Sequence, residues 1–205
     1  MKRIILLLSL IAFPLTALAQ NEDLNLYVKG GLNMHSITGD DISASDYMGI
    51  GYNVVVGYDK SLGQTENLFY GYEVGLGTRG SWYAKDGAKS KMVNHAMQIG
   101  VSLIYRVPIA DNQSLDLHAG LGSTMDFAGK STSEAKVGEE VYSSEVKLKD
   151  YGSGFRRSDI YIAPGITLWL GRFGMDVSWQ RGLMPMQADT NTCVSNILFR
   201  LAYKL

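Results

Sequence analysis

The sequence predicts an all-β protein, an eight-stranded antiparallel up-and-down transmembrane β-barrel. Beyond residue 20 the apolar residues recur with period two, the pattern of strands, and no helix-length stretch follows a 3.6 period. The alternating segments are about 10–14 residues long, whereas a tilted strand needs about 9–11 to cross a bilayer and soluble strands average about 5–6. The chain also has 23 glycines, most of which share the polar parity of these segments. A soluble barrel would alternate too, but these features favour a membrane barrel.

The strands and their connections follow in chain order. We expect strands at 24–35, 48–59, 68–82, 94–107, 115–127, 160–170, 173–179 with an extension, and 194–205. The links after the first, third, fifth and seventh strands are long and polar, and the others are short, down to the two-residue turn Gly171–Arg172. Short turns on one side and long loops on the other are typical of an outer-membrane barrel, with the short turns and both termini periplasmic.

The two faces of these strands differ in composition. Large residues such as Tyr27 and Trp169 share the polar face with the glycines, as expected where side chains fill a narrow bore. Aromatic residues stand near both ends of the apolar face, with Trp82, Phe127 and Trp179 at one end. Such residues form the two interfacial girdles of membrane barrels.

Length, charge and the first residues limit the class of protein. At 205 residues we expect one domain, and a net charge of −1 without a basic run argues against nucleic-acid binding. The single cysteine, Cys193, excludes an internal disulfide and a thiolate zinc site. Residues 1–19 have a basic head, an apolar stretch and small residues before Gln20, which predicts a cleaved signal peptide. The barrel domain would then span 20–205 in the cell outer membrane.

Charged residues of luminal parity are predicted to form a structural network. A charge inside a narrow barrel must be paired, because an isolated buried charge is very costly. The predicted members are Lys29, Glu73, Asp116, His118, Asp176 and Arg200. With large fillers beside them, they predict a closed bore.

No catalytic, cofactor or metal residue is predicted. His118 lies beside Asp116 in sequence and invites a metal or catalytic interpretation, but no second ligand or serine nucleophile has a suitable spacing, so a hydrogen-bonded luminal role is favoured. The segment GLGTRG at 75–80 fits a dinucleotide-binding pattern, which needs a following helix. A loop is expected there instead, and we predict no nucleotide site.

The signal-like start, eight strands, alternating loop lengths and terminal ILFRLAYKL resemble the small outer-membrane β-barrel superfamily that includes OmpA and OmpX. The segments GGLN and GYEVGLG are closest in style to PorT-like barrels. The resemblance implies that the barrel-assembly machinery reads the last strand. The residues concerned would be Phe199, Leu201, Tyr203 and Leu205, with Leu205 in the place where the superfamily commonly has Phe.

The predicted function is a structural or surface-interaction role through the extracellular loops, without enzymatic activity. Within the longest link, 128–159, the segment EEVYSSEVKLKDY could prolong a hairpin beyond the membrane. Expected partners are outer-membrane lipid, the assembly machinery, and an extracellular or periplasmic protein. The alternatives are a carrier of small apolar molecules and a lipid-modifying enzyme.

Overall fold

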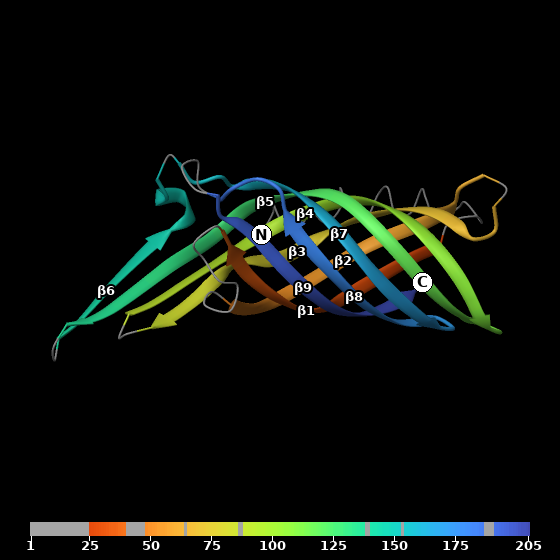
Figure 1. Cartoon of the computed structure of the whole chain (residues 1–205), viewed down its shortest axis with the longest axis horizontal. Coiled ribbons are helices and arrows are strands. Elements are labelled where there is room, and N and C mark those ends of the chain that lie inside the picture. Colours follow the sequence, from red (N-terminus) through yellow and green to blue (C-terminus); the bar gives the residue numbers. More distant parts are fainter. Residues whose placement is uncertain are drawn as a thin grey trace, which may run out of the picture.

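The structure, a computed structural model, describes residues 25–39, 48–63, 65–85, 88–137, 140–152, 154–186 and 191–205. Nine strands lie in these ranges, eight of them in one closed ring (Figure 1). They are β1 (Asn25–Thr38), β2 (Met48–Ser61), β3 (Leu68–Lys85), β4 (Ala88–Ala110), β5 (Gln113–Val137), β6 (Glu140–Lys147), β7 (Ser158–Leu170), β8 (Phe173–Gly182) and β9 (Cys193–Lys204). The predicted signal peptide, residues 1–19, lies outside the described residues, as does residue 24.

The ring is antiparallel throughout and closes between the first and last strands. Each ring strand pairs with its neighbour in the ring, and β1 pairs with β9 from Tyr27–Lys204 to Thr38–Cys193. The strand β6 stands outside the ring and pairs only with β5. The predicted eight-stranded antiparallel barrel is therefore confirmed.

Three ring strands are much longer than the sequence predicted. The strands β3, β4 and β5 have 18, 23 and 25 residues, and within the link expected at 83–93 residues 83–85 and 88–93 are strand. The prolonged hairpin suggested within the longest link is present as β6, opposite residues 130–137 of β5. The extensions of β3, β4 and β5 were not predicted, because both of their faces meet water and no alternation of apolar residues marks them.

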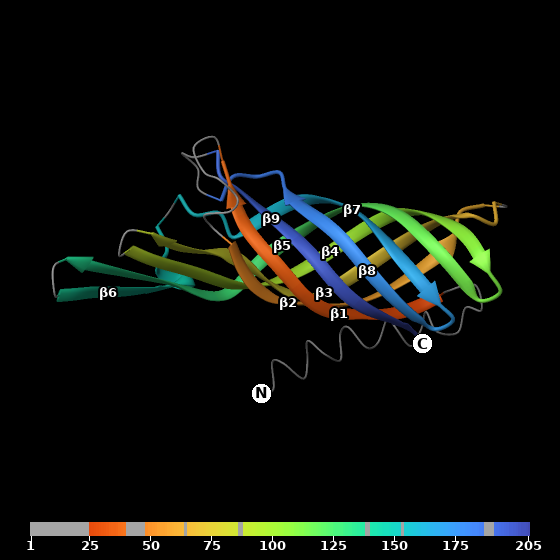
Figure 2. The same ribbon diagram turned by 60° about the horizontal axis from the view of Figure 1, so that its bottom comes forward.

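The added segments form a protruding sheet beyond one end of the barrel. We define it as residues 83–85 of β3, 88–93 of β4, 128–137 of β5, and β6. It extends from the end with the long links, away from the short turns and the C-terminus (Figures 1 and 2). We call these two ends of the barrel the long-loop end and the short-turn end.

Side chains alternate between a filled bore and an exposed outer face. Tyr27 and Trp169 are only 2% exposed inside, whereas Ile50 is 73% exposed outside. Glycine makes room for the large luminal rings, because a Cβ at Gly57 would lie 2.7 Å from the ring of Tyr27. The aromatic residues Trp82, Phe127 and Trp179 are 53%, 53% and 42% exposed, which agrees with an outward-facing girdle.

No helix in the described residues is long and apolar enough to cross a membrane. The one helical element there is the three-residue 3-10 turn η2 (Leu148–Asp150).

Candidate functional site

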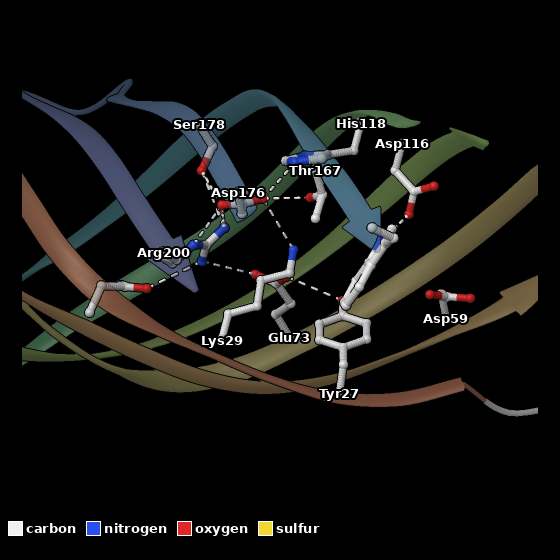
Figure 3. A network of polar contacts seen from close by, with 12 residues as sticks. Tyr27, Lys29, Asp59, Glu73, Asp116, His118, Thr167, Asp176, Ser178 and Arg200 are labelled. Atoms are coloured by element: carbon white, nitrogen blue, oxygen red, sulfur yellow. Dashed lines mark hydrogen bonds and ion pairs between the residues drawn. The ribbon is translucent and has the colours of Figure 1, made fainter. Parts of the chain in front are cut away.

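The centre of the bore holds an ionic cluster around Asp176 of β8 (Figure 3). Arg200 Nη2 lies 2.7 Å from Asp176 Oδ1, and His118 Nε2 lies 3.0 Å from Oδ2. The Thr167 hydroxyl donates to Oδ2 at 2.7 Å, and Lys29 Nζ lies 3.4 Å from the same oxygen. The Asp176 side chain is fully buried, so these contacts replace its hydration.

Glu73 of β3 is the second carboxylate of the cluster. Its oxygens lie 2.8 Å from Lys29 Nζ and 3.5 Å from Arg200 Nη1, and the Tyr27 hydroxyl donates to it at 3.2 Å. Two carboxylates thus face two cations, and five of the six predicted network residues lie together. Four strands of the ring, β1, β3, β8 and β9, supply the charges, so the cluster ties opposite parts of the barrel wall to one another.

The sixth predicted residue, Asp116, belongs to a separate cluster nearer the short-turn end. It accepts hydrogen bonds from Arg106 Nε and from Trp169 Nε1, each at 2.8 Å. Arg106 also lies 3.1 Å from Asp59 and stacks over Phe69, 4.2 Å from the ring centroid. Asp59 and Arg106 were not predicted as members, although both have luminal parity in predicted strands.

A third cluster, also missed, lies toward the long-loop end. Arg79 Nε is 2.7 Å from Asp126 Oδ1, and Arg79 Nη1 is 3.5 Å from Asp159 Oδ2. Asn94 donates to Asp126 at 2.9 Å. Arg79 and Asp126 occupy bore-facing positions of the alternation in predicted strands. Asp159 lies one residue before the predicted sixth strand.

The segment that follows η2 contacts this third cluster. The Tyr151 hydroxyl donates to Asn94 Oδ1 at 3.4 Å, and Arg79 Nη2 donates to the Arg156 carbonyl at 3.2 Å. The ring of Tyr151 packs edge-on against Phe155, with centroids 4.7 Å apart. Burial raises the pKa of Tyr151 to about 12, so the hydroxyl stays protonated as a donor. These contacts hold the segment against the outermost luminal cluster.

The space left inside the bore is small. One cavity of about 50 Å³ borders Lys29, Glu73 and Tyr161, and another of about 20 Å³ borders Asn33 and Arg79. One water molecule needs about 10–15 Å³ of such space, whereas small-molecule sites measure about 300–1,000 Å³. These cavities have room for a few waters.

The geometry around His118 differs from that of a nucleophilic site. The Ser178 hydroxyl donates to Asp176 Oδ1 at 3.2 Å, while His118 contacts the other oxygen of this carboxylate. A serine nucleophile requires its proton to face a base that can remove it. Here Arg200 contacts both Asp176 and Ser178, and the group serves as an ionic brace. Among the described residues, no group of three His, Cys, Asp or Glu side chains could hold a metal ion.

The predicted assembly residues lie on the outer face of β9 or directly after it. Phe199, Leu201 and Leu205 are 47%, 70% and 68% exposed. Tyr203 packs beside Phe173, with ring centroids 5.1 Å apart. This stripe faces outward at the short-turn end, and its role in assembly remains a prediction.

The strand β6 of the protruding sheet is exposed along its whole length. All eight residues of β6 are exposed, including Val141 at 65% and Tyr142 at 58%. Within the described residues β6 pairs with β5 alone, so one edge of β6 has open backbone groups. An open edge is a template for pairing with another chain.

A closed antiparallel ring with an apolar outer face and an ionic bore defines a membrane-spanning β-barrel protein. The chain belongs to the family described as outer membrane protein beta-barrel domain, whose model matches residues 5–170, through the end of β7. It is therefore an outer-membrane β-barrel protein, similar in type to the OmpA and OmpX barrels.

Two solved structures of other proteins illustrate the fold similarity of this chain. Ail, the attachment invasion locus protein of Yersinia pestis, is 12% identical, with 88% of this chain and 99% of that chain covered and a TM-score of 0.47. Neisserial surface protein A is 10% identical, with 90% and 100% covered and a TM-score of 0.45. No curated protein sequence matches this chain.

Proposed function

We propose that this protein is a non-enzymatic surface-interaction barrel, closed in its bore, that contacts an extracellular protein through the protruding sheet. In barrels of this type the short turns face the periplasm, which puts the protruding sheet outside the cell. The single observation that carries the proposal is the exposed edge strand β6, held beyond the membrane by 25-residue β5.

The chemistry of the bore supports the closed state. Three ionic clusters follow one another along the bore, and the cavities between them are about 50 and 20 Å³. An open pore would require these paired charges to separate in a poorly hydrated space, which is costly. The barrel wall thus acts as a rigid anchor for the sheet.

A photo-crosslinking amino acid at position 142 tests the interaction. Tyr142 is exposed on β6, so intact cells should give a defined protein adduct, and the isolated partner should form the same adduct with the purified barrel. The matched control position is Ile99, which is 59% exposed on the lipid-facing part of β4 and should crosslink to lipid only. Absence of a reproducible protein adduct at position 142 would refute the proposal.

A second candidate function, a carrier of small apolar molecules, is favoured by one feature of the outer wall. Pairing between β7 and β8 stops after Ile162–Arg181 and resumes at Gly165–Ser178, beside Pro164, which has no N–H to donate. An apolar groove of about 700 Å³ on the outer wall borders this gap in the pairing. A carrier would bind a fatty acid in a saturable manner that Pro164→Val abolishes, whereas an interaction barrel would show no saturable uptake.

A further inference from the structure

Three lysines gather on one face of the protruding sheet where it leaves the barrel. Lys130 of β5 pairs with Lys147 of β6, and Lys91 of β4 pairs with Thr132 of β5 in the next row. Directly paired residues present their side chains on the same face of a sheet, as do residues two apart. Together with His95 these residues line a groove of about 690 Å³.

A bulge in β5 turns these side chains outward. The pairing with β4 shifts between His95–Ala128 and Ala96–Asp126, which leaves Phe127 as the additional residue. Between the short-turn end and the bulge, the odd-numbered residues of β5 face lipid. Beyond the bulge, in the protruding sheet, the even-numbered residues of β5 are on this outward face. Without the bulge Lys130 would point to the opposite side of the sheet. The bulge is therefore what joins Lys130 to the outward groove.

The groove continues the lipid-facing surface of the barrel at the aromatic girdle. The His95 ring lies 6.4 Å from that of Phe127, and its Nδ1 is 3.1 Å from the Tyr52 hydroxyl. Trp82 pairs with Lys91. The row of Lys130 lies two residues beyond His95, a distance of about 7 Å along the strand. Girdle aromatics mark the headgroup level, so the lysines stand at this level too.

Positive charge is in excess in the row nearest the barrel. That row contains Lys130 and Lys147 without an acid, whereas Lys91 shares the next row with Glu145, and Lys89 pairs with Glu134 one row further out. Lys130 Nζ lies 2.9 Å from Glu145, but the two side chains are 59% and 46% exposed, and such pairs contribute little.

The remaining lysines are open to a ligand. Lys91 and Lys147 are exposed, and neither has an ion pair within the described part of the chain. Their ammonium groups can therefore donate to an incoming anion without breaking an existing contact. The groove thus combines unpaired cations with an apolar floor that leads into the lipid-facing strands.

We propose that this groove binds the phosphate-bearing headgroup of an outer-leaflet lipid. Lys91, Lys130 and Lys147 donate to phosphate oxygens, and the acyl chains lie along the apolar outer face of β4 and β5 below. A lipid fits better than a soluble anion because the groove opens onto membrane-facing residues such as Met125, which is 54% exposed. A volume of about 690 Å³ is within the usual range for small-ligand sites.

Binding of diphosphorylated lipid A to the purified barrel tests this site. The barrel is held in phosphatidylcholine nanodiscs, and the bound lipid A is counted by native mass spectrometry. Lys91→Gln with Lys147→Gln should weaken binding about 30-fold, because each lysine near a membrane surface contributes about 1 kcal/mol toward an anionic headgroup. Lipid A without phosphates should bind the wild-type protein at least as weakly as the double variant binds the phosphorylated form.

The control variant carries Lys89→Gln with Lys136→Gln, which removes the same charge from exposed positions further out on the sheet. It should retain wild-type binding, and both variants should keep the gel mobility of the folded barrel. Equal weakening in the two variants would mean unspecific charge attraction. Unchanged binding by the Lys91→Gln, Lys147→Gln variant would mean that these lysines are only solvated and bind no headgroup. Full competition by soluble inositol hexakisphosphate would assign the site to soluble polyanions. Each of these three results overturns the proposal.

Discussion

Replacing Glu73 by glutamine tests whether the bore is as dry as its ionic cluster requires. The amide keeps the shape of the side chain and can still accept the Tyr27 hydrogen bond, but it removes the charge 2.8 Å from Lys29 Nζ. Lys29 is only 6% exposed, and its remaining carboxylate, Asp176 at 3.4 Å, is already in contact with Arg200. The variant therefore leaves the buried Lys29 ammonium without its nearest carboxylate.

The size of the effect follows from this geometry. Breaking a buried pair by removing one partner costs about 3–5 kcal/mol. The value should lie at the lower end, about 3 kcal/mol, because the Glu73 side chain is 22% exposed and Asp176 still contacts Lys29. Lys29→Met should cost a similar amount, since the one cation that still contacts Glu73 among the described residues is then Arg200, at 3.5 Å.

The double variant, Lys29→Met with Glu73→Gln, provides the control. It removes one charge of each sign and leaves the Asp176–Arg200 pair intact, so its cost should be about 2–3 kcal/mol smaller than the sum of the single costs. Unfolding by urea in lipid vesicles, followed by tryptophan fluorescence and by gel mobility without heating, gives the three free energies. Additive costs, or a Glu73→Gln cost below about 0.5 kcal/mol, would show that water solvates these groups.

Three further predictions concern packing, orientation and assembly. Gly174→Ala should destabilise the barrel by about 1–3 kcal/mol, because the added Cβ would lie 2.7 Å from the indole ring of the β7 tryptophan. Gly152→Ala, where a Cβ meets nothing within 4 Å, should change the unfolding free energy little, and equal effects would contradict this account of the packing. Cys193 begins β9 at the long-loop end, so an impermeant maleimide should label it on intact cells; labelling only after periplasmic access would reverse the orientation. Tyr203→Ala with Leu205→Ser should lower the amount of protein in the outer membrane while the purified chain still refolds in detergent, and normal membrane levels would refute the assembly signal.

Parity along the strands allowed most of the bore to be predicted. Residues two apart face the same side, so Lys29, Glu73, Asp176 and Arg200 could be assigned to the lumen before any fold was known. The same rule applies to Arg79, which has luminal parity in a predicted strand. Parity gives the face of a side chain but not its height along the barrel, so it could not show that Asp116 belongs to a different luminal cluster from Asp176.

The amino-acid sequence was sufficient for the class of fold and for the inward or outward direction of residues in the membrane-spanning parts of the strands. Both follow from a local rule, the two-residue period of an extended chain between a lipid phase and a polar bore. The pairing of charges depended on the tertiary structure, because register brings Lys29 and Asp176, 147 residues apart, into one contact. The protruding sheet and its bulge were likewise decided there. Outside the membrane both faces of a strand meet water, so backbone pairing holds it without any apolar pattern, and one additional residue, Phe127, redirects every side chain that follows.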